Sequence, residues 1–167
     1  YAKGNPAHSG NENRGRFRLR FGFEKKFNPD MKVGFRLASG SSYNTDPTST
    51  NQTFTNDFSG KQILIDRAYA IYTPSWAKIG PIEKLELGGG KFANPFSRGS
   101  TELVWDTDVV PEGIYEMADY NLLDSENAAL KAYTLFGQLP EMENPHTGAK
   151  TNATRFAYQA GLMPEIK

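Results

Sequence analysis

The chain lacks cysteine altogether, and it holds two histidines among its 167 residues. The absence of cysteine excludes disulfide bonds, thiolate zinc sites and cysteine catalysis. His8 and His146 lie far apart in polar stretches, and no Gly-x-Ser-x-Gly sequence accompanies them. We therefore predict no catalytic residues, no metal site and no cofactor.

The chain also lacks an excess of charge and a long hydrophobic run. Nineteen basic residues balance 19 acidic ones, which argues against nucleic acid as the main partner. No run of 18 apolar residues occurs, so we expect no transmembrane helix. A membrane is still compatible with this, because the strands of a β-barrel place their apolar residues at alternate positions.

Aromatic residues and glycine are, in contrast, plentiful. Hydrophobic residues make up 38% of the chain, aromatic residues make up 13%, and there are 16 glycines. This combination is poor for a helical protein and ordinary for an all-β one.

The most regular pattern lies between Arg14 and Gly40. Residues 14–27 alternate between apolar and polar side chains, and so do residues 31–38 after an Asn-Pro-Asp turn. Alternation with a period of two predicts an antiparallel hairpin with one apolar and one polar face. If the turn places Phe27 opposite Met31, then Phe23 faces Phe35. The same register places Phe21 opposite Leu37, Gly22 opposite Arg36 and Arg20 opposite Ala38.

Five further strands are predicted, over residues 62–73, 85–92, 113–122, 129–139 and 153–163. The connections alternate between short ones (28–30, 74–84, 123–128) and long ones (39–60, 93–111, 140–151). This alternation is typical of an up-and-down meander in an outer-membrane barrel. We read residues 1–13 as a flexible leader. The run Gly88-Gly89-Gly90 in the fourth strand predicts a bend or the close approach of another segment.

Two interpretations of the apolar face remain open from the pattern alone. In a soluble sandwich, the phenylalanines pack on a second sheet and the arginines face water. In a barrel, the phenylalanines face lipid and the arginines line an aqueous lumen. The length of the first strand and the tyrosines and Trp76 near the strand ends favour the barrel.

Several sequence blocks resemble the putative porin family of Gram-negative outer membranes, and they occur in the family's order. The blocks are Gly34–Gly40 with Asp46-Pro47 and Ser49–Gln52, Ile65–Tyr69, Gly90–Phe92 with Asn94–Phe96, and Leu103–Asp106 with Asp108 and Pro111–Gly113. The resemblance implies an all-β fold, an antiparallel up-and-down meander that is part of a transmembrane β-barrel. Family members are longer, so residues 14–167, with about seven strands, are expected to be the N-terminal portion of a barrel of about 16 strands.

The predicted pore-lining residues are the cations of the hairpin's polar face: Arg16, Arg18, Arg20, Lys32 and Arg36. The predicted constriction candidates lie in the connection before the fifth strand: Trp105, Asp106, Asp108 and Glu112. The three acidic residues have two further interpretations, a Ca²⁺ site or loop side chains that cap turns or pair with nearby Arg98. Asp66 and Arg67 are expected to form a structural ion pair.

We therefore expect an outer-membrane channel for passive diffusion of small hydrophilic solutes or ions. Its expected surroundings are outer-membrane lipid and lipopolysaccharide, and copies of the chain in a homo-oligomer are a further candidate partner. The alternatives are a secreted β-sandwich that binds carbohydrate or protein through its Ser/Thr/Asn-rich loops, and an envelope scaffold protein.

Overall fold

The structure is a computed structural model that describes residues 15–40, 49–54, 60–99, 103–104, 106, 108–140 and 153–167. Its elements are nine β-strands and two short 3-10 helices over these ranges. In chain order they are β1 (Arg16–Phe17), β2 (Arg20–Asn28), β3 (Met31–Ser39), β4 (Gln52–Thr53), β5 (Ile63–Tyr72), η1 (Ser75–Ala77), β6 (Ile82–Lys91), η2 (Pro95–Ser97), β7 (Glu112–Asp124), β8 (Ala128–Pro140) and β9 (Thr154–Ile166).

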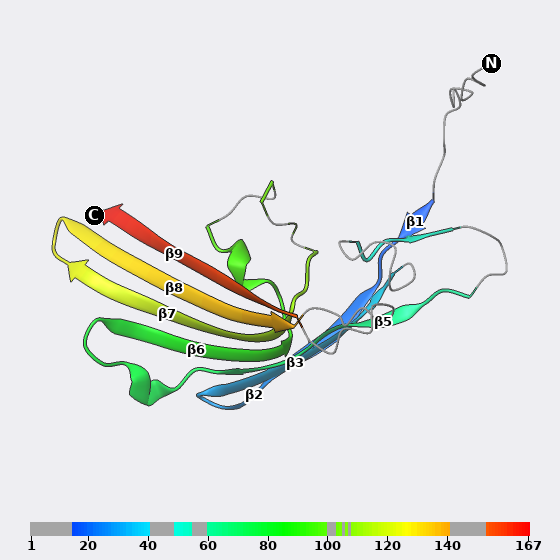
Figure 1. The fold of residues 1–167 in the computed structure, drawn as a ribbon, viewed down its shortest axis with the longest axis horizontal. Helices are drawn as coiled ribbons and strands as arrows, with labels where there is room; N and C mark the ends of the chain where they lie inside the picture. Colours follow the sequence, from blue (N-terminus) through cyan, green and yellow to red (C-terminus); the bar gives the residue numbers. More distant parts are fainter. Residues whose placement is uncertain are drawn as a thin grey trace, which may run out of the picture.

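One antiparallel sheet organises the described part of the chain (Figure 1). Its seven strands follow the order β2-β3-β5-β6-β7-β8-β9, so each strand of the sheet pairs with the next one along the chain. This confirms the predicted all-β meander and its strand number. Within the described residues β2 and β9 form the two edges, and the sheet does not close into a barrel.

The first strand is shorter than predicted. In place of one strand over 14–27, the chain forms β1, which pairs with β4 in a separate two-stranded sheet, and then β2. The ring of Phe17 lies 5.6 Å from that of Phe54, and this contact draws β1 toward the connection that follows β3. Leu19 stays attached to β3, since its backbone N–H donates to Ser39 Oγ at 2.8 Å.

The predicted hairpin register is confirmed over most of its length. Phe23 lies opposite Phe35, Phe21 opposite Leu37, Gly22 opposite Arg36 and Arg20 opposite Ala38.

The register is wrong at the turn, where Asn28 and not Phe27 lies opposite Met31. The Asn28 side chain accepts the backbone N–H of Asp30 at 2.9 Å, which tightens the turn to two residues. Phe27 therefore falls in a β-bulge between Lys26 and Asn28.

The last three strands are longer than predicted, with 13 residues each. In β7 the prediction ended at Leu122, where the apolar and polar alternation is lost. The structure has a bulge between Asn121 and Leu123 at this place, and the strand continues beyond it to Asp124. A bulge shifts the alternation of apolar and polar residues by one position. The sequence pattern therefore predicts an end to the strand where the strand in fact continues.

Two of the three successive glycines of β6 allow the close approach that the sequence predicts. A Cβ on Gly88 would lie 2.0 Å from Cε1 of Tyr115, whose ring covers that glycine. Gly90 has a φ of 112°, and a Cβ there would lie 2.3 Å from the carbonyl oxygen of Ala68. Both positions require a residue without a side chain.

The buried core lies on one side of the sheet, beneath η2. It consists of Phe92, Phe96, Tyr115 and Leu135, and Tyr69 and Met117 pack against it. Figure 1 shows the segment that carries η2 standing over this side of the sheet. The connection between β6 and β7 therefore folds back onto the strands.

Candidate functional site

The hairpin's polar side chains define one face of the sheet, here called the polar face. Arg20 lies on β2, and Lys32 and Arg36 lie on the same side of β3. Two other predicted pore-lining residues precede the main sheet: Arg16 is in β1, and Arg18 lies between β1 and β2.

The connection between β6 and β7, residues 92–111, reaches these arginines. Asp108 forms ion pairs with Arg20 Nη2 at 2.5 Å and with Arg18 Nη2 at 3.2 Å. Arg20 also donates from Nε and Nη2 to Thr50 Oγ1 at 3.0 and 2.8 Å. Because β3, β5 and β6 separate β2 from β7, this contact carries the connection across the polar face.

The beginning of the same connection is held by Arg98. Its guanidinium pairs with Asp119 of β7 and lies 4.4 Å from the centre of the Tyr133 ring of β8. Its backbone carbonyl accepts from Gln159 Nε2 of β9 at 2.6 Å. Three neighbouring strands thus fix one residue of the connection.

Phe96 anchors the connection in the core. Its side chain is 3% exposed, and a Cβ on Gly137 would lie 2.8 Å from its Cζ. The turn that directs it inward is local, because the Asn94 side chain accepts the Phe96 backbone N–H at 3.0 Å and Pro95 fixes the next φ. The sequence Asn94-Pro95-Phe96 is itself an indication of this turn. Nothing in the sequence around Arg98 or Asp119 indicates that these two residues pair.

The remaining constriction candidates do not converge with Asp108. Asp106 is exposed, and its carboxylate accepts the backbone N–H of Asp108 at 2.7 Å, which is a turn-capping role. Glu112 pairs with Lys91 at 2.7 Å where β6 ends and β7 begins. Trp105 lies outside the described residues. The expectation that these acidic residues pair with Arg98 is wrong for the residues described, since the partner of Arg98 is Asp119.

Most other charges on the polar face are also paired. Lys32 contacts Glu24 at 2.7 Å, and Lys84 contacts Glu86 at 2.6 Å. Asp66 pairs with Arg36 of the neighbouring strand. The expected pairing of Asp66 with Arg67 is therefore wrong, because a β-bulge at this point turns both residues toward the polar face and brings Asp66 to Arg36.

The opposite, apolar face is bare over the described residues. Phe21 is 71% exposed, and Phe23, Ile65, Phe156 and Leu162 are each more than half exposed. No second sheet of the described chain covers these side chains, since the other sheet has two strands of two residues. Large exposed apolar patches indicate a surface that contacts a partner or lipid.

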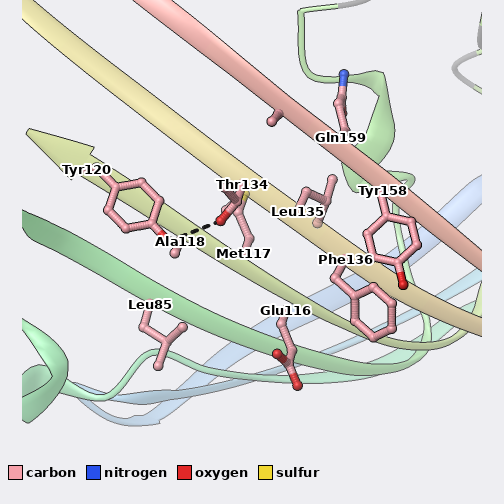
Figure 2. A pocket seen from close by; sticks show the side chains of 11 residues that line it. Leu85, Glu116, Met117, Ala118, Tyr120, Thr134, Leu135, Phe136, Tyr158 and Gln159 are labelled. Atoms are coloured by element: carbon pink, nitrogen blue, oxygen red, sulfur yellow. Dashed lines mark hydrogen bonds between the residues drawn. The ribbon is translucent and has the colours of Figure 1, made fainter. Parts of the chain in front are cut away.

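A hollow of about 440 Å³ opens mainly on the apolar face, and Figure 2 shows the side chains that line it. Phe136 and Tyr158 form one side of it, with ring centres 4.9 Å apart, and the carboxylate of Glu116 lies close by. Tyr158 points away from the segment carrying η2, whereas its neighbour Gln159 points toward it. The alternation of the two faces therefore continues to the last strand.

The described residues hold no group of three or more His, Cys, Asp or Glu side chains that could bind a metal ion. Over the same residues, no helix has the length and apolar character needed to cross a membrane.

Comparison with known proteins gives one result that bears on this arrangement. Searches of curated proteins and of solved structures find no match. The family model described as Putative porin matches residues 3–162, which is nearly the whole chain. The chain therefore belongs to this porin family.

Proposed function

We propose that the protein forms a water-filled pore in the outer membrane, through which small hydrophilic solutes or ions diffuse passively. In this arrangement the polar face lines the lumen and the apolar face contacts lipid. The family makes a channel the expected function and an enzyme unexpected. The bare apolar face supports the orientation, since exposed phenylalanine and leucine are stable in lipid and unfavourable in water.

The observation that carries the proposal is the pair of attachments that the described residues of the β6–β7 connection make to the sheet. Arg98 and Phe96 hold its beginning on β7, β8 and β9, and Asp108 holds its end on β2. We infer that this connection lies inside the lumen and narrows it. A loop that extended outside the barrel would not be expected to bury Phe96 against the sheet or to pair Asp108 with arginines of the polar face.

The paired charges modify the expected selectivity. Arg18 and Arg20 share one carboxylate, and Arg36 and Lys32 each have an acidic partner. We infer that these cations give the polar face a modest positive potential and not a strong one. Charged side chains that line a pore set its ion preference, so we expect weak anion preference.

The surroundings follow from the same proposal. Outer-membrane lipid and lipopolysaccharide would contact the apolar face, and solutes or ions would contact the polar face. Copies of the chain in a homo-oligomer remain a candidate for part of the apolar face. Nucleic acid is not an expected partner of a chain whose net charge is zero.

Planar-bilayer recording of the full-length protein tests this function. We expect discrete, ohmic conductance steps, with a reversal potential in a salt gradient that is shifted slightly toward the anion. Protein unfolded before addition serves as the control and should give no steps. Absence of steps from correctly folded, inserted protein would contradict the pore and would favour a scaffold role.

The secreted sandwich makes a different prediction about solubility. That fold has to cover the apolar face with a second layer, and we would then expect the full-length protein to be monodisperse without detergent. A pore should aggregate when detergent is removed, because its apolar face is exposed. Size-exclusion chromatography with and without detergent separates the two.

A further inference from the structure

Arg36 and Arg67 occupy directly opposed positions of β3 and β5, on the polar face. Arg36 donates from Nε to Asp66, its acidic partner. Arg67 makes no ion pair or side-chain hydrogen bond with the described residues, and its Nε is a buried donor without an acceptor. The two arginines are thus neighbours on adjacent strands, and only Arg36 has a carboxylate as an ion-pair partner.

An unpaired buried donor on a cation is unfavourable. Removal of such a group from water costs free energy unless an acceptor replaces the lost water. The adjacent positive charge of Arg36 adds to that cost. An anion supplied from the solvent would reduce both contributions.

The space for such an anion is present. A hollow of about 360 Å³ is lined by Gly22, Phe23, Glu24, Phe35, Arg36, Arg67 and Tyr69. All of these except the two phenylalanines belong to the polar face by register. Gly22 lies opposite Arg36 on the next strand, and its missing side chain keeps the hollow open. Glu24 is already paired with Lys32, so it does not neutralise Arg67 by an ion pair.

We propose that Arg67, with the remaining N–H groups of Arg36, forms a binding site for an oxyanion, a carboxylate or phosphate group. The inference rests on the proposed function, because it places the site on the wall of the lumen. The planar guanidinium group presents several donors in a fork that matches two oxygens of one oxyanion. Chloride lacks that geometry and should bind less well.

The site lies near the contact between Asp108 and Arg20. Arg20 is on β2, two residues before Gly22, and Asp108 belongs to the connection that crosses the face. A solute that passes the narrowed region would therefore meet Arg67 close to it. Oxyanions would be concentrated there, and a bound oxyanion would obstruct chloride.

The test is chloride conductance of the full-length protein in planar bilayers, at constant ionic strength, with inorganic phosphate or acetate added. We expect saturable inhibition by either probe in the unmodified protein. Arg67→Gln should raise the half-inhibiting concentration about tenfold, the effect of losing one charge-assisted contact. Arg67→Lys keeps the charge but loses the fork, and it should give an intermediate value.

Lys131→Gln is the matched control, because Lys131 is a cation on the same face, on β8, without an ion pair to a described residue. It should leave inhibition unchanged. Inhibition by phosphate alone would assign the site to phosphate, and inhibition by both probes would assign it to oxyanions in general. Equal effects of the Arg67 and Lys131 variants, or no inhibition in a conducting channel, would overturn the site while the pore stands. If Arg67→Gln does not insert into the bilayer, the half-inhibiting concentrations of Arg67→Lys and Lys131→Gln are compared instead. A higher value for Arg67→Lys supports the site, and equal values overturn it.

Discussion

At the residue scale, tyrosine rings on the polar face lie over glycines of a neighbouring strand. A Cβ on Gly34 would lie 2.3 Å from Cζ of Tyr69, and one on Gly161 would lie 2.3 Å from Cε1 of Tyr133. Tyr115 covers Gly88 in the same way. Each ring therefore covers the backbone of the neighbouring strand at its glycine.

This arrangement predicts that Gly88→Ala destabilises the protein. The new methyl group displaces the Tyr115 ring, which is buried and donates to Glu86 Oε1 at 2.7 Å, so a loss of about 1–3 kcal/mol is expected. Urea unfolding in lipid vesicles measures this loss of unfolding free energy. Gly89→Ala is the matched control, because its nearest contact would be 3.6 Å away, an ordinary distance. Equal losses in the two variants would contradict the packing described.

At the scale of elements, the connection over 92–111 is attached at both ends, and each attachment has a different physical basis. The attachment at Phe96 is mainly apolar burial. The attachment at Asp108 is ionic and partly exposed, since the Arg18 side chain is 41% accessible and that of Arg20 is 28% accessible. Salt should therefore weaken the second attachment more than the first.

Asp108→Asn tests the ionic attachment. The Asp108 side chain is only 12% accessible, so removal of its carboxylate should cost about 1–3 kcal/mol and let this end of the connection move. It also leaves Arg18 and Arg20 without their shared acidic partner. We expect larger conductance fluctuations and a reversal potential shifted further toward the anion.

The control for this change is Asp124→Asn, which removes an acidic residue paired with Lys167 at the far end of β7. Its channel properties should match those of the unmodified protein. An unchanged reversal potential in Asp108→Asn would show that the Asp108 contact plays no part in conduction.

Phe96→Ala tests the apolar attachment. Truncation of a buried phenylalanine lowers the free energy of unfolding by about 3–5 kcal/mol when the surroundings do not collapse. The same change should release η2 from the sheet. Phe54→Ala is a suitable control, since Phe54 is 62% exposed. We expect a large loss of unfolding free energy and noisier currents in the first variant. Similar behaviour of the two variants would argue against the anchor.

The sheet was predictable from the sequence, whereas the folded-back connection was not. The alternation around Phe21 and Phe23 is local, and it fixes faces and register without knowledge of distant residues. The pairing of Arg20 with Asp108 joins residues 88 positions apart, and neither sequence neighbourhood specifies the other. Bulges at Phe27 and near Leu122 hid the strand ends for a related reason, because one extra residue inverts the alternation.

At the scale of the whole molecule, the two faces of the sheet differ in the side chains that they present. The polar face carries most of the charge pairs, the folded-back connection and the buried core. The apolar face carries exposed aromatic and aliphatic side chains, and Glu116 is an exception on it. A membrane pore requires that the first face be wet and the second be in lipid.

The accessibility of introduced cysteines to a thiol reagent measures directly which face of the sheet is in contact with water. The chain suits this method because it contains no cysteine. Met163→Cys and Lys26→Cys place a thiol on the polar face, opposite Lys131 and Lys32 respectively. Leu162→Cys and Phe23→Cys place one on the apolar face, where the native side chains are 69% and 59% exposed. A membrane-impermeant, negatively charged thiol reagent is applied during bilayer recording.

We expect rapid reaction and a stepwise change of conductance for the two polar-face variants. We expect no change for the two apolar-face variants, because lipid excludes the reagent. Equal reaction at all four positions, or reaction at Leu162→Cys and Phe23→Cys alone, would contradict the assignment of the polar face to the lumen.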